Sequence, residues 1–189
     1  MPETLLSDLV SDPATASLKV PPHSLEAEQA VIGGLMLDNN AWDQVADQVT
    51  SADFYRRENQ LVFSAIQSLA ETGSPFDVVT LSEWLASNDS LEDVGGIAHL
   101  GELAKNTPSV ANVVAYARIV RERSVLRELV HVANEIAESA FNTEGRSANE
   151  LMDTAERLVF QIAESGNRRL KGFVNIKEVL ASVVERIDE

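Results

Sequence analysis

The fold is decided by residues 109–164, which read SVANVVAYARIVRERSVLRELVHVANEIAESAFNTEGRSANELMDTAERLVFQIAE. Apolar residues recur there at spacings of three and four, which predicts a helix to about Phe141 and, beyond it, a second helix. Gly145 closes the first helix, and Ser147 with Glu150 forms a capping-box pattern that opens the second. The first stripe comprises Leu126, Leu129, Val130, Ala133, Ile136, Ala137 and Ala140; the second comprises Leu151, Ala155, Leu158, Val159 and Ile162. Two such helices and a short turn predict a long antiparallel helical hairpin over 109–164.

The segment before the hairpin, residues 21–108, is predicted to form a compact globule of shorter helices. Ser24 has the side chain of an N-cap for a first helix that ends at Leu37. Further helices are predicted over 41–49, over 57–70, from a capping box at 80–83 to about residue 86, and between residues 96 and 108. Gly33 and Gly34 each cost the first helix about 1 kcal/mol relative to alanine, so we expect a neighbouring helix to pack directly on that backbone. Since no segment shows a clear strand alternation, the fold class is all-α.

The two ends of the chain differ from its helical middle. Residues 1–20 are acidic and aperiodic and predict a disordered tail. Residues 165–174 combine two glycines with three basic side chains, as is typical of a flexible basic linker. Residues 175–189 predict a terminal amphipathic helix, whose apolar face comprises Ile176, Val179, Leu180, Val183 and Ile187. This face either folds back on the chain's own core or docks on another domain or subunit, and we favour docking.

The composition excludes several classes of protein. The chain has 189 residues, with 30 acidic against 15 Lys and Arg residues and a formal net charge of −15. This excess argues against a domain whose main work is binding DNA phosphates, although it does not exclude one local basic patch. No cysteine is present, which excludes disulfides and cysteine-ligated zinc. The apolar runs are too short to span a membrane and no signal peptide is recognisable, so we expect a cytoplasmic protein.

The sequence carries no recognisable catalytic pattern. It contains no Gly-x-x-x-x-Gly-Lys-[Ser/Thr] phosphate-binding loop and no Gly-x-Ser-x-Gly nucleophile motif. The three histidines, His23, His99 and His131, do not share a metal-binding spacing. We therefore expect no enzymatic activity, no metal and no cofactor in this chain.

An arginine cluster on the first hairpin helix allows two interpretations. Arg118, Arg121, Arg123 and Arg127 alternate with glutamates, which favours an exposed helix with pairs such as Arg118–Glu122. The alternative is a contact with DNA or with an acidic partner, supported by the basic residues of 165–174. Steep salt dependence of DNA affinity would favour that alternative, which the acidic composition disfavours.

Residues 21–38, which read PPHSLEAEQAVIGGLMLD, resemble the beginning of the bacterial replicative DNA helicases of the DnaB family. The resemblance continues through residues 53–55, 77–81, 106–113, 116–123 and 155–164, and it covers the chain from about residue 19 to residue 189. It implies an N-terminal domain followed by a linker helix. The family's RecA-like ATPase domain, which carries the phosphate-binding loop, ATP and Mg²⁺, has no counterpart in these 189 residues.

What the resemblance implies about assembly agrees with the predicted terminal helix. In this family the hairpins pair into dimers, and three dimers form a collar on a hexameric ring. The linker helix, here 175–188, docks on the ATPase domain of a neighbouring subunit. Self-association from dimer to hexamer is therefore expected.

The resemblance also implies partners. The family's collar binds the C-terminal domain of primase and, in many bacteria, the helicase loader. The hairpin is the usual primase platform, which points to Leu129, Val130, Ile136 and Leu151; alternatively, these residues only hold the hairpin together. We expect a collar domain that assembles the hexamer and recruits primase, while full-length relatives unwind duplex DNA with ATP hydrolysis. The alternative is a free-standing helical adaptor that binds primase or loader without a motor.

Overall fold

The structure is a computed structural model that describes residues 20–170, with side chains described to Glu164. The predicted tail, except for its last residue, and the predicted terminal helix lie outside the described residues. The helices are α1 (Leu25–Leu37), α2 (Trp42–Val45), α3 (Arg57–Glu71), α4 (Val78–Ser87), α5 (Gly96–Lys105), α6 (Val113–Phe141) and α7 (Ala148–Leu170), with 3-10 turns η2 (Asn39–Ala41), η3 (Ser51–Asp53), η4 (Glu92–Val94) and η5 (Val110–Asn112). Residues 20–170 contain no strand, which confirms the all-α class, and no helix among them is long and apolar enough to cross a membrane.

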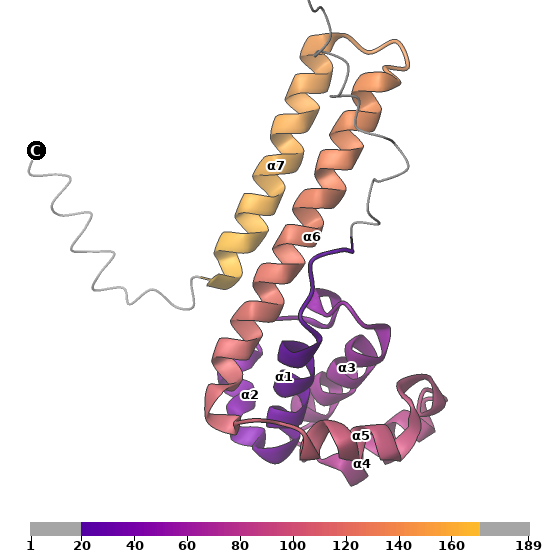
Figure 1. Cartoon of the computed structure of the whole chain (residues 1–189), viewed down its shortest axis with the longest axis vertical. Coiled ribbons are helices and arrows are strands. Elements are labelled where there is room, and N and C mark those ends of the chain that lie inside the picture. Colours follow the sequence, from indigo (N-terminus) through magenta and orange to yellow (C-terminus); the bar gives the residue numbers. More distant parts are fainter. Residues whose placement is uncertain (1–19, 171–189) are drawn as a thin grey trace, which may run out of the picture.

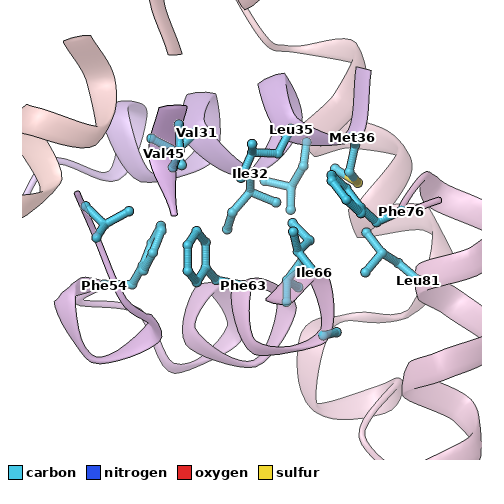
Figure 2. Close-up of a cluster of buried hydrophobic side chains, with 14 of the residues drawn as sticks. Val31, Ile32, Leu35, Met36, Val45, Phe54, Phe63, Ile66, Phe76 and Leu81 are labelled. Carbon is cyan, nitrogen blue, oxygen red and sulfur yellow. The ribbon is translucent and has the colours of Figure 1, made fainter. Parts of the chain in front are cut away.

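Helix α1 is the element around which the globule is built. It begins after Ser24, whose side chain accepts a hydrogen bond from the first helical turn, as the sequence predicts. It packs against α3, α5 and α6, and its side chains Val31 and Ile32 are fully buried. Figure 2 shows Ile32 facing Phe63 and Ile66, which α3 contributes, while Val31 lies beside Val45. Each such burial contributes about 1.5–3 kcal/mol, so the α1–α3 layer supplies much of the core's stability.

Gly33 and Gly34 allow two elements to approach the middle of α1, which confirms the prediction of close packing. A β-carbon at Gly33 would clash with the Thr107 side chain and with the Leu103 carbonyl at the end of α5. A β-carbon at Gly34 would lie 3.2 Å from Cγ2 of Val113, the first residue of α6. The end of α5 and the beginning of α6 therefore lie directly on the bare backbone of α1.

Helix α6 belongs both to the globule and to the hairpin. Val113, Ala117 and Val120 in its first half are members of the buried core of the globule. The globular unit therefore extends beyond residue 108, where the sequence placed its end, because helical periodicity cannot show which part of a continuous helix is covered. The second half of α6 runs away from the globule and lies beside α7 (Figure 1).

Helix α7 begins with the predicted capping box. The Glu150 carboxylate accepts a hydrogen bond of 2.7 Å from the Ser147 N–H, and the Ser147 hydroxyl accepts one of 3.4 Å from the Glu150 N–H. The helix then continues to Leu170, so the predicted linker over 165–174 is helical in its first six positions. A glycine within a helix costs only about 1 kcal/mol, and Gly166 therefore does not by itself end one.

Helix α4 begins three residues earlier than predicted, because its cap is Asp77 and not Thr80. The Asp77 carboxylate accepts hydrogen bonds of 2.9 Å from the N–H groups of Val79 and Thr80. The Thr80 hydroxyl in turn accepts one from the Asp77 N–H, which completes a reciprocal box. The bond from the Thr80 N–H is the main reason why the pKa of the Asp77 carboxyl lies below its ordinary value of 3.8.

Replacing Asp77 by alanine is expected to lower the free energy of unfolding at neutral pH by about 1 kcal/mol, the usual contribution of an N-cap. Because the folded-state pKa of Asp77 is lowered, this contribution is present above the unfolded-state value of 3.8 and is lost as the pH falls through the folded-state pKa. Urea denaturation at neutral pH and near pH 3 checks this. As a control, Asp77→Asn keeps a capping oxygen and should retain most of the stability at neutral pH. If the wild type were more stable than Asp77→Ala by the same amount near pH 3 as at neutral pH, the assignment of Asp77 as the cap of α4 would be contradicted.

Candidate protein-interaction site

The hairpin formed by the second half of α6 and by α7 is held by an apolar seam. Val132 of α6 and Ile162 of α7 are each only 6% exposed. Ile136 and Leu158 line one small cavity between the two helices. On α6 the seam is centred on Val132 and Ile136. The face of α6 that packs against α7 is therefore rotated around the helix from the predicted apolar stripe, and most residues of that stripe are exposed.

The structure separates the four predicted partner-binding residues into two groups. Leu129 and Val130 are 45% and 49% exposed. Ile136 and Leu151 are half-buried, and Ile136 faces the seam. Only Leu129 and Val130 are therefore accessible to a partner without opening the hairpin. The predicted docking face of Ile176, Val179, Leu180, Val183 and Ile187 lies outside the described residues.

Two arginines of α6 tie the base of the hairpin to the globule. Arg121 is only 4% exposed, and its Nη1 lies 2.6 Å from Oδ1 of Asp53 in η3. The hydroxyl of Ser124 donates to the same oxygen over 2.8 Å, and Arg127 donates to the Asp53 carbonyl. The prediction of an exposed, charge-laced helix is therefore wrong at Arg121 and at Arg127, because positions three apart on α6 face η3 and are covered by it.

A stack of side chains fixes the entry into α1 against the same base. Arg127 donates a hydrogen bond of 2.8 Å to the carbonyl of Pro22, and its guanidinium lies 5.8 Å from the centre of the Tyr55 ring. The His23 ring stacks on Tyr55 with centres 4.4 Å apart and planes 12° apart. Burial lowers the pKa of the Arg127 guanidinium, which still remains charged at neutral pH. The segment before α1 is therefore clamped where the globule meets the hairpin.

Comparison with known proteins places this arrangement in a family. Residues 20–122 match the family model of the DnaB-like helicase N terminal domain. The chain belongs to this family. The replicative DNA helicase DnaB of Haemophilus influenzae is 46% identical over 178 residues, and that of Geobacillus stearothermophilus is 38% identical over 172 residues.

The match covers nearly all of this DnaB-family chain but only part of its relatives. It includes 94% of the chain and 38% of the H. influenzae protein, and 91% and 37% in the G. stearothermophilus pair. The crystal structure of the N-terminal domain of the Mycobacterium tuberculosis DnaB helicase is similar, with a TM-score of 0.71 and 33% identity over 75% of this chain and 99% of that one. A DnaB-like replicative helicase, studied with its interactions with primase, shares the fold with a TM-score of 0.63 and 21% identity, over 88% of this chain and 35% of that one. These findings confirm the family that the sequence resembles.

The DnaB-family hairpin also exposes apolar residues that the sequence did not single out. Met152 and Phe160 of α7 are 62% and 65% exposed, and Phe141 at the tip is 92% exposed. Val159, which the sequence placed in the buried stripe, is 46% exposed. The available signal was the spacing of seven from Met152 to Val159, which marks a second apolar line beside the seam. Large apolar residues exposed together are typical of surfaces that bind other proteins.

The buried carboxylate of Glu28 is structural and shows no catalytic arrangement. It is 1% exposed and accepts hydrogen bonds from the Tyr55 N–H at 2.7 Å and from the Asn59 amide at 2.8 Å. It also accepts from the Arg56 N–H and thereby fixes the backbone that leads into α3. Over the described part of the chain, no three His, Asp or Glu side chains are arranged to hold a metal.

Proposed function

We propose that this chain is the N-terminal collar domain of a hexameric replicative DNA helicase, in which it organises the ring and binds primase. The observation that carries this proposal is the projecting hairpin with its exposed apolar side chains, in a chain aligned with DnaB helicases over nearly its whole length. A solved DnaB-like helicase of the same fold is described with its interactions with primase, which supports primase as the partner. We place this work in the bacterial cytoplasm.

The exposed and half-buried residues of the hairpin have different roles in this proposal. Leu129 and Val130 of α6, with Met152 and Phe160 of α7, contact a second copy of the chain and the C-terminal domain of primase. Ile136 and Leu151 hold the two helices together. The helicase loader binds the same collar, and the apolar face of 175–189 docks on the ATPase domain of a neighbouring subunit. Since the chain carries a net charge of −15, it binds DNA weakly.

Helicase activity, ATP and Mg²⁺ belong in this proposal to the ATPase domain of full-length relatives, and the 189 residues alone hydrolyse no ATP. A free-standing adaptor that binds primase or loader without a motor is the alternative. The intact mass of the native protein distinguishes the two, because an ATPase domain adds roughly 200 or more residues. A native mass close to 20.6 kDa would favour the adaptor.

Val130→Asp is expected to weaken self-association of the chain, primase binding or both by about a hundredfold, because a charge buried unpaired in an interface costs several kcal/mol. Sedimentation velocity measures the first effect, and calorimetric titration with the primase C-terminal domain measures the second. The matched control is Val79→Asp, since Val79 is 63% exposed but lies on α4 of the globule. Loss of binding in the control, with unchanged binding in Val130→Asp, would move the interface from the hairpin to the globule.

A further inference from the structure

A cavity of about 500 Å³ lies where η3 meets the base of the hairpin. Its lining runs from exposed to buried residues, since Glu128 and His131 are exposed while Asp53 and Arg121 are buried. Arg127, which is half-buried, contributes a second guanidinium group. The volume falls within the usual range of pockets that bind ligands. The cavity therefore connects the solvent with a buried cation.

Arg121, which lines this cavity, has one edge without a partner. Its Nη1 donates to Asp53 over 2.6 Å, while Nε and Nη2 are buried and have no hydrogen-bond partner within residues 20–164. The N–H groups of Nε and Nη2 lie on the same edge of the guanidinium and form a fork that can donate to two oxygens at once. Because buried donors are nearly always paired in proteins, this edge favours the binding of an acceptor.

The two carboxylates in the lining do not serve this edge. Oδ1 of Asp53 accepts hydrogen bonds from Nη1 of Arg121 and, over 2.8 Å, from the Ser124 hydroxyl. Oδ2 of Asp53 accepts from the Thr50 N–H over 2.7 Å and from the Thr50 hydroxyl over 3.1 Å. Glu128 is exposed and makes no hydrogen bond to Nε or Nη2 of Arg121. The acceptor for the fork is therefore a separate group.

The shape of the fork and the local charge select a carboxylate as that group. A carboxylate presents two oxygens in one plane, which match two parallel N–H groups. The formal charges of Arg121 and Arg127 are balanced in the lining by those of Asp53 and Glu128. A phosphate group, which carries close to two negative charges at neutral pH, is repelled more strongly by these carboxylates than a singly charged acid is.

We propose that this cavity is a binding site for a single carboxylate, which accepts hydrogen bonds from Nε and Nη2 of Arg121. The carboxylate belongs either to a small organic acid or to an acidic side chain of a second copy of the chain, which has 30 acidic residues. A second copy bound to the hairpin would reach the cavity, because Leu129 and Val130 lie between its lining residues Glu128 and His131 on α6. The site does not depend on primase binding, because the fork of Arg121 alone defines its ligand.

Titration of the full chain with sodium acetate, followed by NMR spectroscopy, tests the proposal. The direct reporter is the Nε–H signal of Arg121, because a hydrogen bond to a carboxylate moves the donor proton to lower field. We expect a saturable shift of this signal and of the backbone amides of Ser124 and His131. Sodium chloride at the same ionic strength should not produce it, and the amide of Glu92, which lines a different cavity, should not respond to acetate.

The variant Arg121→Lys separates the fork from the charge. Lysine keeps a cation beside the buried Asp53 carboxylate but lacks the planar pair of N–H groups. We expect circular dichroism to show a folded chain, and the Ser124 and His131 signals to report an acetate affinity about tenfold lower, as loss of a charge-assisted hydrogen bond predicts. The matched control is Arg118→Lys, the same substitution at an exposed position of α6, which should leave the affinity unchanged.

The two sources of the carboxylate differ in their dependence on protein concentration. If a second copy supplies it, the Nε–H signal of Arg121 moves toward its acetate-bound position as the chain is concentrated without acetate. If a small acid supplies it, the signal does not change with protein concentration, and acetate alone moves it. The proposal would be overturned by the absence of a saturable acetate shift in the wild type, by a larger shift with sodium phosphate, or by equal acetate affinities of the wild type and a folded Arg121→Lys.

Discussion

Gly33→Ala is expected to lower the free energy of unfolding by about 3 kcal/mol, at the upper end of what overpacking costs in a core. The added methyl group meets the Thr107 side chain and, at still greater cost, the Leu103 carbonyl, which belongs to the backbone and cannot rotate away. Relief requires the end of α5 to move off α1, and this movement uncovers part of the core. Urea denaturation followed by far-UV circular dichroism measures the change.

Gly101→Ala is the matched control for this substitution. Gly101 lies within α5, and a β-carbon there meets no atom within 4 Å. Alanine should therefore raise the stability by about 0.5–1 kcal/mol through its better helix propensity. Gly34→Ala should fall between the two, because its β-carbon meets no backbone atom but only the Val113 side chain, with Cγ2 at 3.2 Å and Cβ at 3.5 Å. Equal effects at Gly33 and Gly101 would contradict the close approach of α5 to α1.

Arg121→Leu is expected to lower the free energy of unfolding by about 3–5 kcal/mol, because it removes the guanidinium that is bonded to the buried Asp53 carboxylate at 2.6 Å. Asp53 is 2% exposed and also receives the Thr50 N–H at 2.7 Å, so it cannot turn toward water without disrupting η3. The cost should change little with added salt, since buried pairs are weakly screened. Thermal and urea denaturation at low and high ionic strength measure both effects.

The control for Arg121 lies one turn earlier on the same helix. Arg118 is exposed, and Arg118→Leu should change the stability by no more than about 0.5 kcal/mol. The two variants remove the same charge from the same helix, so a difference between them reports the buried pair and not the net charge of the protein. Similar losses in both would show that Arg121 contributes no more than an exposed arginine.

The features that the sequence predicted correctly depend on neighbouring residues. The N-cap at Ser24, the capping box of Ser147 with Glu150 and the close packing at Gly33 follow from side chains a few positions apart. The partner of Arg121 did not follow, because Asp53 lies 68 positions away and only the tertiary fold brings η3 to α6. Local spacing shows that a helix exists but not which of its charged residues will be covered.

The candidate site was predictable only in part, for a related reason. The hairpin helices carry apolar residues on two adjacent lines, and a periodicity cannot indicate which line faces the partner helix. Val132 belongs to the seam, although the predicted stripe omitted it, while Val130 from that stripe is half-exposed. The family resemblance depended instead on the exact amino-acid sequence of residues 21–38. The spacing of apolar residues alone could not have indicated the family.

The continuity of α6 has a mechanical consequence. Its 29 residues form one uninterrupted rod of about 44 Å, at 1.5 Å per residue. One end of this rod is embedded against α1, and the other carries the hairpin tip. Because α6 has no break along its length, it bends little. A force that a partner applies at the hairpin tip is therefore transmitted along α6 to the core of the globule. The domain can therefore report an event at its far end by tilting as one piece.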